Sequence, residues 1–135
     1  MKMRELGRAL VTVVVAQLLL AAATFAWVAA YSHWIAPGLP LERYSAHAAL
    51  AGPWISLLIG VPVYDVVLRR LAHRPSLRPR RIALVAWSVA ASLDLASVAL
   101  ADTSPPIHPA LLAGILLAKA TGCLLGSRAA HPNRP

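Results

Sequence analysis

The apolar residues of this chain form long blocks rather than periodic stripes. These blocks cover about residues 9–31, 46–68, 82–101 and 107–126. Because about 20 apolar residues cross the hydrocarbon core of a bilayer, each block is long enough to be a transmembrane helix. The pattern therefore predicts an all-α integral membrane protein, whose four transmembrane helices form an up-down-up-down bundle and a single domain over residues 1–135.

The first block follows a basic start that contains Lys2, Arg4 and Arg8. A signal peptide begins in the same way, but its apolar core usually has only about 7–15 residues. The uncharged block from Ala9 to Ala30 is longer than that. We therefore expect an uncleaved first helix.

The second block contains two prolines, Pro53 and Pro62. A proline inside a helix removes one backbone hydrogen bond and crowds the preceding turn, so both positions are predicted kinks. A backbone carbonyl released in this way needs a polar partner within the protein, because lipid offers none. We expect this helix to pack against its neighbours at both kinks.

The distribution of charge predicts the orientation of the bundle in the membrane. Only 13% of the residues are charged, yet the formal net charge is +8. Between the second and third blocks lies a basic segment, predicted as a loop over residues 69–81. Its arginines are Arg69, Arg70, Arg74, Arg78, Arg80 and Arg81. Cytoplasmic loops of membrane proteins are enriched in Lys and Arg, so both termini and this loop are predicted to be cytoplasmic, in the inner (plasma) membrane of a bacterium.

The basic segment also bears on partners. Its arginines lie between apolar blocks rather than on a soluble face, which argues against nucleic-acid binding. Topology alone accounts for them, and binding of anionic lipid by the same arginines is the alternative. The last residues, 127–135, are polar and basic, and we expect a disordered tail there.

Four of the polar side chains within the predicted helices are the main candidates for function. They are Gln17, Asp65, Asp94 and Lys119. Asp65 has the i, i+4 spacing to Arg69 of a helical ion pair. Asp94 has no basic residue within one turn, so it must be protonated or find a cation on another helix, and Lys119 is the obvious cation. A cluster of the four would either fix the packing of the helices or carry protons.

The fourth block contains small residues at every fourth position. These are Ala110, Gly114, Ala118, Gly122 and Gly126. Such a row lets another helix approach closely, although alanine-rich helices also produce it by chance. The partner would be a helix of the same chain, a second copy in a homo-oligomer, or another membrane protein.

Three histidines are predicted at the outer face of the membrane: His33, His47 and His108. Together they would suit a metal ion, and two would suit haem, but no paired motif such as HxxxH supports either. The sequence also lacks HExxH, GxSxG, a Walker loop, GxGxxG and CxxC. We therefore expect no enzymatic activity and no cofactor.

Three functions remain open from the sequence. The first is a structural or accessory membrane subunit held by helix packing. The second is a small proton-coupled transporter that uses Asp94. The third is a metal- or haem-binding membrane protein that uses the outer histidines. Substrate, partner and oligomeric state are not encoded in any recognisable motif.

Overall fold

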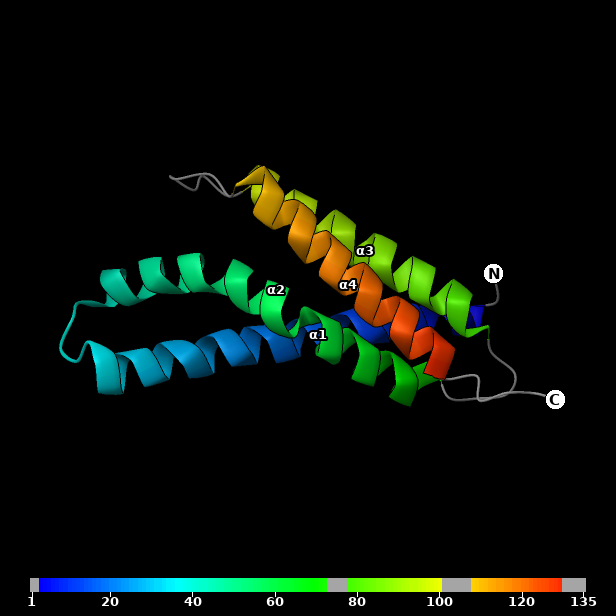
Figure 1. Cartoon of the computed structure of the whole chain (residues 1–135), viewed down its shortest axis with the longest axis horizontal. Helices are drawn as coiled ribbons and strands as arrows, with labels where there is room; N and C mark the ends of the chain where they lie inside the picture. The colour runs from blue at the N-terminus through cyan, green and yellow to red at the C-terminus, as the bar shows by residue number, and fades with distance from the viewer. Residues whose placement is uncertain (1–2, 73–77, 101–107, 130–135) are drawn as a thin grey trace.

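The computed structural model describes residues 3–72, 78–100 and 108–129, and every element in these ranges is helical (Figure 1). The helices are α1 (Met3–Ala30), the π-helical turn η1 (Tyr31–Ile35), α2 (Leu41–Ala72), α3 (Pro79–Leu100) and α4 (Pro109–Ala129). Four helices are long and apolar enough to span a membrane. This agrees with the all-α, four-helix prediction.

The helices at the arginine-rich end are longer than predicted. Arg69 and Arg70 form the last turn of α2, and Arg80 and Arg81 belong to the first turn of α3, so the predicted loop over 69–81 is wrong for these residues. Likewise, Ser127 and Arg128 belong to α4 rather than to a disordered tail. Arginine is a good helix former, so the helices continue beyond their apolar blocks. Arg74 lies outside the described residues, as do most of the predicted tail and the last residue of the third block.

Prolines begin the two later helices. Pro79 and Pro109 occupy the first helical position, where the missing N–H group has no intrahelical partner in any case. The backbone carbonyl of Arg78 accepts from the N–H groups of Arg81 and Ile82. Pro79 falls within the predicted loop over 69–81, but a proline at the first helical position favours the helix that follows it.

The turn between α1 and α2 is short. The N–H of Ala36 donates to the carbonyl of Tyr31, which closes the π-helical turn, and Gly38 has a φ of 80°. The hydroxyl of Tyr44 donates to the carbonyl of Ala36 at 2.7 Å and accepts from the N–H of Leu39 at 3.0 Å. These bonds allow α2 to begin at Leu41, five residues before the predicted start of the block at 46.

Pro53 and Pro62 both lie inside α2, which stays helical through them. The helix changes direction along its length in Figure 1. Gly60 lies close to Pro62, and a Cβ added to Gly60 would be 3.8 Å from Cγ of Lys119. α4 therefore covers Gly60, whereas Pro62 itself is exposed.

Successive helices run in opposite directions, but the most extensive contact joins α2 and α4, which run in parallel (Figure 1). Leu57 lies opposite Gly114, and Asp65 lies opposite Gly126, so the residue numbers on the two helices rise together. α1 contacts α2 and α3, whereas α2 and α3 barely touch. The order around the bundle is therefore α1, α2, α4, α3, rather than the order of the sequence.

The buried core lies near the arginine-rich end. Its members are Ala9, Val13, Ala16, Leu20, Tyr64, Leu68, Ile82, Ala83, Ala86, Ala90 and Cys123. At the opposite end, η1 and residues 41–59 of α2 contribute no buried side chain. The α1–α2 pair extends beyond the α3–α4 pair and diverges from it there (Figure 1).

Candidate functional site

The candidate site is an ion pair between α3 and α4. Nζ of Lys119 donates to both carboxylate oxygens of Asp94, each at 2.7 Å. The Lys119 side chain is only 2% exposed and that of Asp94 is 18% exposed. Two charge-assisted bonds to one carboxylate are the strong kind of hydrogen bond, and they neutralise both charges where water is scarce.

The Lys119 side chain contacts α2 as well as α3. Its aliphatic stem lies against α2, since a Cβ on Gly60 would be 3.8 Å from Cγ of Lys119. Its ammonium group lies 5.9 Å from the centre of the Tyr64 ring, within the range of a cation–π interaction. One lysine on α4 thus contacts α2 through its stem and binds α3 through its charge.

Tyr64 is the residue that sequence reasoning missed. Its side chain is fully buried, and within the described residues its hydroxyl has no hydrogen-bond partner. Burial of a polar group without a partner is costly, so this position is under strong structural constraint. Its depth between α2 and α4 follows from the parallel packing of these helices, for which the sequence gives no signal.

The other two polar candidates lie apart from this pair. Asp65 bonds to Arg69 on its own helix, with Nε to Oδ1 at 2.8 Å, which is the i, i+4 pair that the spacing predicts. Gln17 is half-buried on α1, and no hydrogen bond links it to Asp94 or Lys119 in the described part of the chain. Of the predicted cluster of four, the structure therefore brings together only Asp94 and Lys119.

The row of small residues on α4 faces α2. A Cβ on Gly122 would lie 2.5 Å from the carbonyl oxygen of Val61, and one on Gly126 would lie 2.8 Å from the carbonyl oxygen of Asp65. Ala118 is buried in the same contact, and Gly114 faces Leu57. Ala110, the first member of the row, is exposed. The partner of this row is a helix of the same chain.

On its other side, α4 is joined to α3 by polar bonds. The indole N–H of Trp87 donates to the carbonyl of Leu116 at 3.1 Å. This bond and the Asp94–Lys119 pair lie on the same side of α4 and fix its contact with α3. α4 therefore packs by shape against α2 and by polar bonds against α3.

The three histidines serve different local roles. His47 stacks on Tyr31, with ring centres 3.8 Å apart, and its Nε2 accepts from the indole N–H of Trp27 at 3.0 Å. Nδ1 of His108 accepts from the N–H of Ala110 and caps α4, while His33 is exposed on η1. Across residues 3–72, 78–100 and 108–129, no three His, Cys, Asp or Glu side chains are grouped to hold a metal ion.

Comparison of the chain with protein-family models, with curated proteins and with solved structures finds no match. The function must therefore be argued from the residues themselves.

Proposed function

We propose that this protein is a structural or accessory subunit of a bacterial inner membrane, held together by helix packing and assembled with a second membrane protein or a second copy. The observation that carries this proposal is the Lys119–Asp94 ion pair. Both carboxylate oxygens are bound by one buried ammonium group that links α4 to α3. A pair satisfied in this way favours a role in specifying which helices pack together.

The exposed apolar surface supports an assembly role. In each of the four long helices, only 22% to 39% of the most apolar stretch of 18 residues is buried inside the protein. α2 is the least covered, and its exposed side chains include Leu50, Trp54 and Leu58. Lipid covers such a surface in a monomer, and another helix covers part of it in a complex.

The distribution of charge supports a cytoplasmic location for both termini. Arg4, Arg8, Arg69 and Arg70 lie near one end of the α1–α2 pair, where the guanidinium of Arg8 donates to the carbonyl of Leu71. The arginines at the start of α3 and the end of α4 lie at the same end of the bundle. Arg43 lies at the other end. By the positive-inside rule, the arginine-rich end faces the cytoplasm.

A charge swap tests the proposed role. Asp94→Asn and Lys119→Met each remove the ion pair, so we expect both to lower the abundance of the protein and of any complex seen on native gels of solubilised membranes. Asp94→Lys combined with Lys119→Asp rebuilds a pair with the charges exchanged, and we expect it to restore both. A swapped variant that is as abundant as the wild type but no longer forms the complex would contradict a pure packing role.

A proton-coupled transporter is the second candidate, and the partial exposure of Asp94 favours it. Its carboxylate is 18% exposed, against 2% for Lys119, so protons have better access to the acid than to the base. A carrier of this kind would release protons when its substrate is added, and Asp94→Asn would abolish the release. Pyranine fluorescence in proteoliposomes measures this, and no release across a broad panel of organic cations and neutral solutes would end the idea. The charge swap separates the two candidates, because it restores packing but moves the carboxylate to α4.

A further inference from the structure

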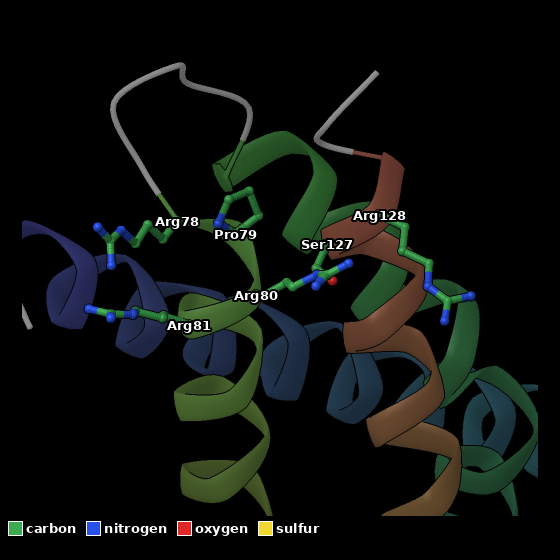
Figure 2. A pocket seen from close by; sticks show the side chains of 6 residues that line it. All are labelled: Arg78, Pro79, Arg80, Arg81, Ser127 and Arg128. Atoms are coloured by element: carbon green, nitrogen blue, oxygen red, sulfur yellow. The ribbon is translucent and has the colours of Figure 1, made fainter. Parts of the chain in front are cut away.

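Two hollows lie one above the other along the contact between α3 and α4. The first, of about 610 Å³, is at the arginine-rich end and is lined by Arg78, Pro79, Arg80, Arg81, Ser127 and Arg128 (Figure 2). The second, of about 180 Å³, is lined by Ala83, Leu84, Trp87, Ala120, Cys123 and Leu124. The first is basic and the second is formed by apolar side chains and the Trp87 ring.

The basic pocket contains four arginines. Neither ion pair between described residues, Asp65–Arg69 or Asp94–Lys119, involves any of them. The pocket also lies at the first turn of α3, where the helix dipole favours an anion. In Figure 2, Arg80 and Ser127 approach each other from α3 and α4, while Arg128 extends from the end of α4.

The apolar hollow continues the same face of both helices. Leu84 and Trp87 are four and seven residues after Arg80, and Leu124 is four residues before Arg128, so each lies on the same side of its helix as the arginine. Leu84 is 58% exposed and Leu124 is 50% exposed, which leaves the hollow open to the surface of the bundle. An anion site thus leads directly into an apolar groove.

We propose that this face binds an anionic phospholipid, with its phosphate between Arg80 and Arg128 and part of one acyl chain in the apolar hollow. A basic pocket between transmembrane helices on the cytoplasmic side is the arrangement that recognises such headgroups. A free phosphate would use only the first hollow. The inference rests on the proposed membrane location, which carbonate extraction of cell membranes tests separately.

Native mass spectrometry of the purified full chain tests the site. The protein is mixed with phosphatidylglycerol or with phosphatidylcholine of the same acyl chains, and inorganic phosphate is titrated in a separate arm. We expect preferential retention of phosphatidylglycerol. Arg80→Gln with Arg128→Gln should weaken that retention roughly 25-fold, at about fivefold for each arginine. The matched control, Arg4→Gln with Arg43→Gln, removes the same charge outside the pocket and should leave retention unchanged.

A second pair of variants separates lipid from free phosphate. Ala120→Trp fills the apolar hollow, whereas Ala96→Trp adds the same bulk to an exposed position of α3. We expect only Ala120→Trp to reduce lipid retention, with no change in the phosphate titration. Circular dichroism checks that each variant is folded.

Three results would overturn the proposal. The first is equal retention of the two lipids. The second is an equal loss in the arginine pair and its control, which would show a general effect of charge. The third is equal lipid retention in the Ala120→Trp and Ala96→Trp variants, together with displacement of the lipid by inorganic phosphate. That result would show a phosphate pocket without a site for the acyl chain.

Discussion

The two sides of α4 hold their neighbours by different physical means. Toward α2, glycines let the backbones approach until a single added carbon would overlap Val61 or Asp65. Toward α3, the contact depends on an ion pair and one indole hydrogen bond, and an apolar hollow remains between the helices. The first contact depends on the absence of side chains and the second on their presence.

The difference indicates how each contact tolerates change. A shape-based contact between backbones cannot adjust to an added side chain, because protein interiors are packed close to the density of crystals. A polar contact tolerates replacement when both partners change together, and fails when one partner is left alone. We therefore expect the contact with α2 to be sensitive to the size of the side chains on α4. We expect the contact with α3 to be sensitive to the loss of one partner of a polar pair.

The largest effect is expected at the ion pair. Asp94→Asn leaves the Lys119 ammonium buried without an anion, and loss of one partner of a buried pair costs about 3–5 kcal/mol. Lys119→Met should cost less, because the Asp94 carboxylate that it leaves without a partner is 18% exposed, whereas the Lys119 side chain is only 2% exposed. Reversible unfolding in mixed micelles, followed by circular dichroism, measures both changes.

The double variant provides the control. Asp94→Asn with Lys119→Met leaves no charge without a partner, so its free energy of unfolding should lie closer to that of the wild type than the value for Asp94→Asn alone. If the two substitutions are simply additive, the ion pair does not hold the contact between α3 and α4.

The next largest effect is expected at the glycine contact. Gly122→Ala places a carbon 2.5 Å from a backbone oxygen, and overpacking of this kind costs about 1–3 kcal/mol. Gly114→Ala is the matched control on the same helix, because its nearest obstacle is the end of the flexible Leu57 side chain at 3.1 Å. We expect it to be close to neutral. Equal losses in the two variants would show that backbone contact does not limit the approach of α2 and α4.

The smallest effect is expected at Trp87. Trp87→Phe keeps an aromatic ring but removes the indole N–H, so the loss should be that of one neutral hydrogen bond, about 0.5–1.5 kcal/mol. The carbonyl of Leu116 stays within its own helix, which limits the cost. A loss greater than that of Gly122→Ala would show that the ring itself, rather than its polar bond, joins α3 to α4.

Much of the fold follows from the sequence, because the length of an apolar block is a local property. The four helices were predicted, and so was the pair between Asp65 and Arg69, which needs only the pitch of a helix. The helix ends were predicted less well, since Arg70 and Arg80 are compatible with a helix in water as well as with a loop. Pro79 was misread because the same residue that interrupts a helix also begins one.

The candidate site was only partly predictable for the same reason. The sequence made Lys119 the obvious cation for Asp94, but it also placed Asp65 and Gln17 in the same predicted cluster. Which residue pairs with Lys119 depends on how each helix is rotated about its axis and on which helices are neighbours. Both are properties of the assembled bundle. Tyr64 was missed because its burial depends on the parallel contact of α2 with α4. The pocket at Ser127 and Arg128 was missed because these residues were assigned to a tail.

The neighbour order of the bundle has a consequence for how the protein is made. α2 is synthesised before α4, yet the two form the most extensive contact in the molecule. Until the last helix leaves the ribosome, Tyr64 lacks the helix that covers it. The packing of the α1–α2 hairpin is therefore completed only after α4 has been synthesised.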